Sequence, residues 1–263
     1  MDIKFGYDTY QDVRHNLFLY STPVLIVAGF FAYFRILPQS AQDRVTQAIG
    51  GLASTPIWKS VLNGLSGLIF FAILAFLMTE VLQIHDQYYD KFVIKWRFRY
   101  ATDFILPRLT QPFASFMNYR FYEEAEGHIR QFQERLYYPF VGDRELKIPK
   151  NKLVRFYEVV TPYWLTQINE IVLMLLVVMI VICRFTVPSD LIYRTLLLSD
   201  LLIIIGAWLL NRIWVRASRE KVRRATEDEI AAIHSDQGLL QDLQAKLQDL
   251  CRDYSIPYDA PEN

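Results

Sequence analysis

The chain has 263 residues, and its 28 Lys and Arg residues equal its 28 Asp and Glu residues, so the formal net charge is zero. This balance excludes the strongly basic composition of many nucleic-acid binders and gives no sign of an acidic tail. Hydrophobic residues make up 52% of the sequence and gather into several long runs, which is uncommon in soluble domains. The expected fold class is all-α: a polytopic membrane protein with four transmembrane helices and a helical cytoplasmic domain.

The chain starts with residues 1–16, a polar segment with interspersed aromatic residues, which we expect to lie at the membrane interface. The first apolar run follows, from Leu17 to Leu37, and its one charge, Arg35, lies near the end. Crossing a hydrocarbon core takes about 20 apolar residues. The run is too long for a signal peptide and is not followed by a small-residue cleavage site. It therefore predicts a retained spanning helix.

A second apolar run, from Val61 to Ile84, contains Glu80 as its only charge. Residues 17–84 are thus predicted to hold the first two membrane helices. Apolar and aromatic side chains then recur every four residues as far as Tyr100, which predicts that the second helix continues out of the membrane. Residues 85–162 as a whole predict a helical cytoplasmic domain.

Two further spans are predicted within residues 163–215. The third centres on Ile171 to Cys183, and the fourth extends from Leu191 to Val215. They are close enough in the sequence to form a tight hairpin around Pro188. Residues 216–263 then predict a cytoplasmic helical tail.

The distribution of lysine and arginine sets the expected orientation. Basic residues follow the second and fourth predicted spans and precede the third, whereas the two connecting loops on the other side carry few. By the positive-inside rule, both termini and the central domain should face the cytoplasm. The expected location is the cell inner membrane, with several passes.

Two patterns describe the tail. Thr226 and Glu229 have the spacing of a capping box, which predicts the start of a new helix. A short heptad-like stripe of leucines follows a second predicted break at residues 235–238, and its members are spaced three, four and three residues apart: Leu240, Leu243, Leu247 and Leu250. Two heptads are too few to define a coiled coil. Two interpretations therefore stay open: a helix docked on the cytoplasmic domain, or oligomerisation through this stripe.

Charged residues inside the predicted spans are the main functional candidates, because an ionised group in hydrocarbon is costly. Asp200 lies inside the fourth span, with Arg194 in the same span and Arg184 at the end of the third. An arginine–aspartate pair across the hairpin is one expectation. Such a group would line a pore or ion path, or would serve as a structural lock between helices or subunits. Glu80 and Glu170 lie near helix ends, where we expect them to reach water.

Basic and aromatic residues alternate directly beyond the second predicted span. The pattern is typical of the cytoplasmic flank of a membrane helix, and it also suits binding of anionic lipid head groups or a cytoplasmic ligand. Direct contact with nucleic acid is the least favoured interpretation. The candidate residues are Lys91, Lys95, Trp96, Arg97 and Arg99.

Motifs for catalysis or metal binding are scarce. His85 lies near Asp86 and Asp90, and Glu124 lies one helical turn before His128. A metal site needs three or four ligands, and the sequence contains no phosphate-binding loop or nucleophile elbow. We therefore expect no metal, no cofactor and no enzymatic activity. An enzyme acting on lipid would have to use the His85 cluster.

Four spans are few for a secondary transporter, and no inverted repeat is evident. A homo-oligomer in the lipid bilayer is therefore the expected route to any pore. The leading hypothesis is an oligomeric membrane protein whose cytoplasmic domain binds a ligand or protein partner and controls permeability, as an ion channel would. The layout resembles that of small multi-helix membrane effectors of bacterial anti-phage defence. The resemblance is of layout alone, so it assigns no residue a role. The alternative is a non-conducting anchor or scaffold that recruits a soluble partner protein.

Overall fold

The computed structural model describes residues 6–50, 73–82, 101–117, 121–142, 146–186 and 191–259. These residues form helices joined by short turns, and the extended pairing among them is one isolated antiparallel bridge between Met117 and Tyr258. The all-α prediction is confirmed for this part of the chain.

The chain divides into two compact units. We call residues 14–85 and 161–218 the membrane unit, and residues 1–13, 86–160 and 219–263 the globular unit. The predicted central domain and the predicted tail thus contribute to one unit. Two long helices, α10 (Lys150–Thr186) and α11 (Leu191–Ser235), supply residues to both units.

The membrane unit contains helices that are long and apolar enough to cross a bilayer. Within the described residues there are three: Tyr10–Ile36, Lys150–Phe185 and Leu197–Ser235. They match the first, third and fourth predicted spans, so the protein is a membrane protein by this measure. Most of the second predicted span lies outside the described residues. Its described part, residues 73–82, is helical and includes the π-helical turn η2 (Leu77–Val81).

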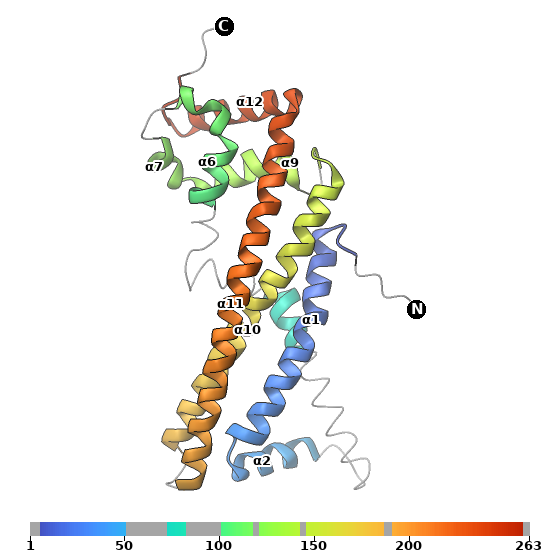
Figure 1. Ribbon diagram of the computed structural model, residues 1–263, viewed down its shortest axis with the longest axis vertical. Helices are drawn as coiled ribbons and strands as arrows, with labels where there is room; N and C mark the ends of the chain where they lie inside the picture. The colour runs from blue at the N-terminus through green and yellow to red at the C-terminus, as the bar shows by residue number, and fades with distance from the viewer. Residues whose placement is uncertain are drawn as a thin grey trace. The chain divides into compact units, whose positions relative to one another are not determined.

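Helices α1 (Tyr10–Phe31), α10 and α11 run side by side (Figure 1). Small and branched apolar side chains fill the space between them; those buried are Ala32, Ile36, Leu176, Ile180, Cys183, Leu197 and Ile204. Large apolar side chains also point outward, including Phe185, which is 82% exposed, and Leu202, which is 70% exposed. An apolar outer surface on such helices suits contact with lipid.

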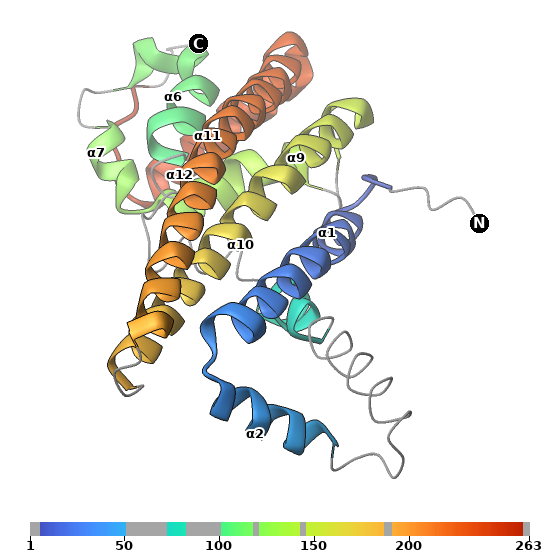
Figure 2. The same ribbon diagram turned by 60° about the horizontal axis from the view of Figure 1, so that its bottom comes forward.

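The first span ends at Pro38. The residue before a proline is restricted to extended conformations, and Leu37 accordingly has φ −71° and ψ 134° directly after the π-helical turn η1 (Ala32–Ile36). The amphipathic helix α2 (Gln39–Gly50) then departs from α1 at an angle (Figure 2). Pro38 thus fixes the point where the chain leaves the first span.

The globular unit consists of short helices in succession. They are η4 (Ala101–Ile105), α6 (Leu106–Leu109), η5 (Gln111–Phe116), α7 (Phe121–Glu126), α8 (Ile129–Phe132), η6 (Gln133–Tyr137), α9 (Tyr138–Val141) and α12 (Gln237–Asp253). Prolines at or near several of their starts keep these helices short. Phenylalanine rings from the first half of the unit pack in one core with α12 and the end of α11.

The capping-box prediction at Thr226 is wrong. Helix α11 continues through this position, and the Thr226 hydroxyl donates to the carbonyl oxygen of Val222 at 3.1 Å, a bond typical of threonine inside a helix. The apolar stripe that includes Val222 and Ile230 is buried, which holds the helix together across the polar sequence. The second predicted break, at residues 235–238, is confirmed: Asp236, ten residues after Thr226, caps α12 by accepting hydrogen bonds from the backbone nitrogens of Gly238 and Leu239.

Candidate functional site in the membrane unit

Asp200 and Arg35 form an ion pair inside the membrane unit. The Asp200 side chain, on α11, is fully buried, and its Oδ1 accepts hydrogen bonds from Arg35 Nη2 at 2.8 Å and Nε at 3.1 Å. The second carboxylate oxygen, Oδ2, is buried and has no hydrogen-bond partner among the described residues. A carboxylate in this setting depends on its cation, because loss of one partner leaves a buried charge.

The expected partner of Asp200 was an arginine of the hairpin, and the structure instead pairs Asp200 with Arg35 of η1. Arg184 is exposed near the end of α10. Arg194 belongs to α11, and its side chain lies outside the described residues. The signal that could have identified Arg35 was its position as the one charge in the first apolar run.

Two more ion pairs connect helices of the same unit. Glu170 of α10 contacts Arg212 of α11 at 2.6 Å, and Arg14 of α1 contacts Glu80 of η2 at 2.6 Å. The expectation that Glu170 reaches water is wrong, since its side chain is 6% exposed. Together with the Arg35–Asp200 pair, these contacts link three different pairs of helices: α1 with η2, η1 with α11, and α10 with α11. The three pairs lie at different positions along the helices.

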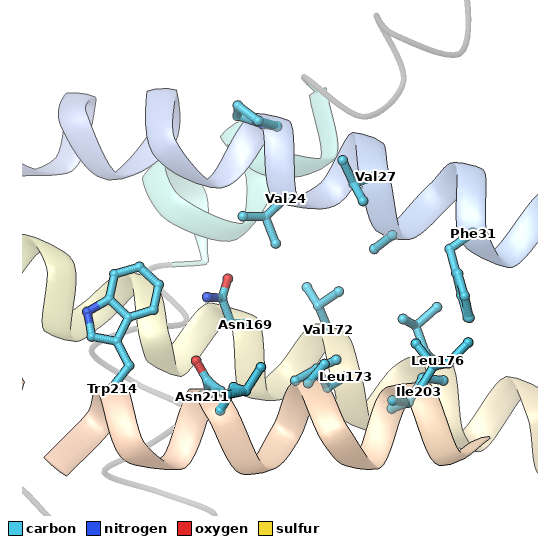
Figure 3. A pocket seen from close by; sticks show the side chains of 15 residues that line it. Val24, Val27, Phe31, Asn169, Val172, Leu173, Leu176, Ile203, Asn211 and Trp214 are labelled. Carbon is cyan, nitrogen blue, oxygen red and sulfur yellow. The ribbon is translucent and has the colours of Figure 1, made fainter. Parts of the chain in front are cut away.

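An apolar groove of about 590 Å³ lies between α1, α10 and α11. Figure 3 shows Val172, Leu176 and Ile203 along the groove, with Asn169, Asn211 and Trp214 gathered at one end. Its volume falls within the range of about 300–1,000 Å³ that is typical of small-molecule sites. The groove therefore has the size of a ligand site and a distinct polar end.

The polar end carries two unsatisfied acceptors. Asn211 is 6% exposed and donates from Nδ2 to the carbonyl oxygen of Thr166 at 2.9 Å. This bond fixes the amide orientation, so that Asn211 Oδ1 is the free acceptor. Neither Asn211 Oδ1 nor Asn169 Oδ1 has a hydrogen-bond partner in the described part of the chain. Neither asparagine was among the predicted site residues, although an amide close to an apolar run is a detectable signal.

The predicted oligomerisation stripe lies in the core of the globular unit. Leu243, Leu247 and Leu250 are fully buried there, and Leu240 packs against the same core while partly exposed. Docking on the chain's own core is therefore the interpretation that fits this geometry. An interface through the three buried leucines would require the unit to open.

For the other predicted sites the structure gives less information. The basic and aromatic residues Lys91, Lys95, Trp96, Arg97 and Arg99 lie outside the described residues, as does the His85 cluster. The His128 ring stacks on Tyr254 at 4.1 Å between centroids, in the globular unit. Across the ranges that the structure describes, no group of three or more His, Cys, Asp or Glu residues could hold a metal ion.

One carboxyl group of the globular unit is strongly perturbed. The apolar part of α11 ends near Val215, and Glu229 comes several turns later. Glu229 therefore lies outside the membrane-spanning segment. Burial raises the pKa of Glu229 to about 8, although its Oε2 accepts a hydrogen bond from the Tyr137 hydroxyl at 2.6 Å. Its Oε1 is buried without a partner among the described residues. Glu229 is therefore mostly protonated at neutral pH, and this neutral form is the more stable one in an apolar core.

A comparison with protein families gives one match. The profile of the YmfE protein family matches residues 19–244, which include most of both units. No curated protein and no solved structure matches the chain.

Proposed function

The chain belongs to the YmfE protein family, and for this member we propose a role as an oligomeric membrane protein in which the globular unit binds a ligand or protein partner and thereby controls membrane permeability. Asp200 carries the proposal: its carboxylate is fully buried in a candidate span, and Oδ2 has no hydrogen-bond partner in the part of the chain that the structure describes. Ionisable groups inside spans commonly mark ion or substrate pathways.

The proposed topology has four spans, with both termini and the globular unit on the cytoplasmic side of the inner membrane. Support for this orientation comes from the basic residues that follow the apolar part of α11, among them Arg216, Arg219 and Arg224. In this arrangement Arg14–Glu80 and Glu170–Arg212 lie towards the cytoplasmic face, and Arg35–Asp200 lies towards the opposite face.

An assembly of several copies would provide the pore. A single chain offers few spans, and its candidate spans pack on one another through apolar side chains. The outward-facing apolar surface of α10 and α11 is available to lipid or to another copy. In an oligomer, Arg35 is placed to act as the switch, because its 44% exposed side chain can leave the Asp200 carboxylate more easily than the buried aspartate can move.

The test is ion flux through liposomes that contain the purified protein. Asp200→Asn keeps the side-chain volume and removes the charge, and we expect it to change potassium flux by about tenfold or more. Asp249→Asn, on the exposed face of α12, is the matched control and should leave flux unchanged. Equal flux for both variants and the wild type, with equal insertion, would refute a role for Asp200 in permeation.

The alternative is a non-conducting scaffold that holds a soluble partner at the membrane. The observation in its favour is that the three ion pairs seen among the described residues of the membrane unit each form within one chain, as in a purely structural lock. A scaffold predicts no flux from any variant and a partner that co-purifies equally with the wild type and Asp200→Asn. A role in anti-phage defence adds a further expectation, that the pore slows growth of a bacterial host when opened.

A further inference from the structure

We infer that the groove between α1, α10 and α11 binds one membrane phospholipid whose head group carries N–H donors, with an acyl chain along the groove and the donor at Asn211 and Asn169. This inference concerns a lipid site and is independent of ion permeation. It holds equally for a pore and for a scaffold.

The apolar part of the groove suits a hydrocarbon chain. Three helices that could span a membrane line it, so hydrocarbon surrounds the groove in a bilayer. Val27 from α1, Val172 from α10 and Ile203 from α11 contribute aliphatic side chains, and Ala28 and Ala207 leave space where larger residues would fill it. An elongated apolar groove between small residues accommodates an acyl chain, whereas a bulkier ligand would not fit along it.

The asparagines at the polar end determine which hydrogen-bonding groups the lipid head group must carry. Among the described residues, neither the buried Asn211 Oδ1 nor the nearby Asn169 Oδ1 has a hydrogen-bond donor. Buried acceptors are nearly always satisfied in folded proteins. Both groups are acceptors, so the complementary ligand is a donor such as a primary ammonium group. A quaternary choline head group has no N–H and cannot satisfy them.

The polar end also lies at the right depth for a head group. Asn169 and Asn211 are near the ends of the apolar parts of α10 and α11, where Trp214 and then Arg216 follow. Tryptophan and arginine are typical of the membrane interface. The acyl chain would thus extend from the interface toward the bilayer centre, in the normal orientation of a phospholipid.

The experiment uses brominated lipids, which quench tryptophan fluorescence on contact. The reporter keeps Trp214 and replaces Trp58, Trp96, Trp164 and Trp208 with Phe. It is reconstituted with phosphatidylethanolamine or phosphatidylcholine that carries the same brominated acyl chains at the same mole fraction. We expect phosphatidylethanolamine to quench Trp214 more strongly than phosphatidylcholine does.

Matched variants separate the site from the general lipid shell. Asn211→Leu and Asn169→Leu keep the number and branching of the side-chain heavy atoms and remove an acceptor, so each should reduce the difference between the two lipids. Ala207→Phe fills the groove and should abolish that difference, whereas Leu209→Phe, on the exposed side of the same helix, should leave it intact. Native mass spectrometry of the intact protein should show one retained phosphatidylethanolamine that Ala207→Phe loses.

Three outcomes would overturn the inference. Equal quenching by both lipids in the unmodified reporter would show that the asparagines do not select a donor. A head-group preference that survives Ala207→Phe would place the preferred lipid outside the groove. If quenching falls only when the protein self-associates on dilution of lipid, the occupant of the groove is a second copy of the chain, which also contradicts a lipid site.

Discussion

Arg35 and Asp200 lie 165 residues apart in the sequence, and two nitrogens of the arginine donate to one oxygen of the fully buried aspartate. This contact joins the end of the first span to the fourth predicted span. Among the described residues, Arg35 is the cation that contacts the Asp200 carboxylate, and its side chain is 44% exposed.

Arg35→Met should destabilise the membrane unit by leaving Asp200 without its cation. Breaking a buried pair costs about 3–5 kcal/mol, and partial exposure of Arg35 should bring the loss nearer to about 2 kcal/mol. Adding Asp200→Asn to this variant should recover part of the loss. Thermal unfolding in detergent measures both, with Arg184→Met as the control at an exposed arginine of α10. Equal losses from Arg35→Met and Arg184→Met would show that the pair contributes nothing.

Glu229 should make the globular unit less stable as pH rises. Its pKa is raised from 4.5 to about 8 on folding, so the folded state keeps a proton that the unfolded state releases. The stabilisation is fully present below pH 4.5 and is lost as pH rises through about 8, at up to about 1.4 kcal/mol per pH unit. Glu229→Gln should flatten this dependence.

The measurement for Glu229 is thermal unfolding between pH 5 and pH 8, with the variant compared to the wild type at each pH. The stability of Glu229→Gln relative to the wild type should increase steadily across this range. Glu220→Gln, at an exposed position on α11, serves as the control and should parallel the wild type. Parallel profiles for Glu229→Gln and the wild type would mean that Glu229 is ionised in the folded protein.

Cys251 should resist alkylation in the folded protein. Burial raises the pKa of this thiol to about 12, which leaves little thiolate at neutral pH. In a Cys183→Ala background, labelling with iodoacetamide at pH 8 should be at least about tenfold slower in native conditions than in denaturant. Fast labelling of the native protein would show that the end of α12 opens readily.

Leu247→Ala tests the role of the leucine stripe. The side chain is fully buried, so truncation should cost about 2–5 kcal/mol of unfolding free energy. Leu240→Ala, at a partly exposed position of the same stripe, should cost less. Mass measurements in nanodiscs should give the same subunit number for Leu240→Ala as for the wild type. A smaller assembly for Leu240→Ala without loss of stability would assign the stripe to contacts between copies.

The sequence predicted what depends on local composition. Run length and hydropathy identified the helices around Leu17, Ile171 and Leu202, because about 20 apolar residues in a row rarely have another use. The break at Asp236 was also predicted, since a capping side chain acts within a few residues.

Contacts that depend on tertiary packing were not predicted. Arg35 was passed over as a partner of Asp200 because nothing local relates residues in different spans. Thr226 was misread because a threonine hydroxyl can cap a helix or bond back to the preceding turn, and only the burial of neighbouring Val222 decides between the two. The groove with Asn169 and Asn211 arises from three helices together, so no single stretch of sequence shows it.

The most direct test of the central claim is potassium flux through liposomes containing the wild type, Asp200→Asn or Asp249→Asn at equal protein content. The account predicts flux from the wild type and Asp249→Asn, and flux altered by about tenfold or more for Asp200→Asn. Three preparations that insert equally and show no flux, or flux that does not depend on Asp200, would contradict a permeability role and favour the scaffold.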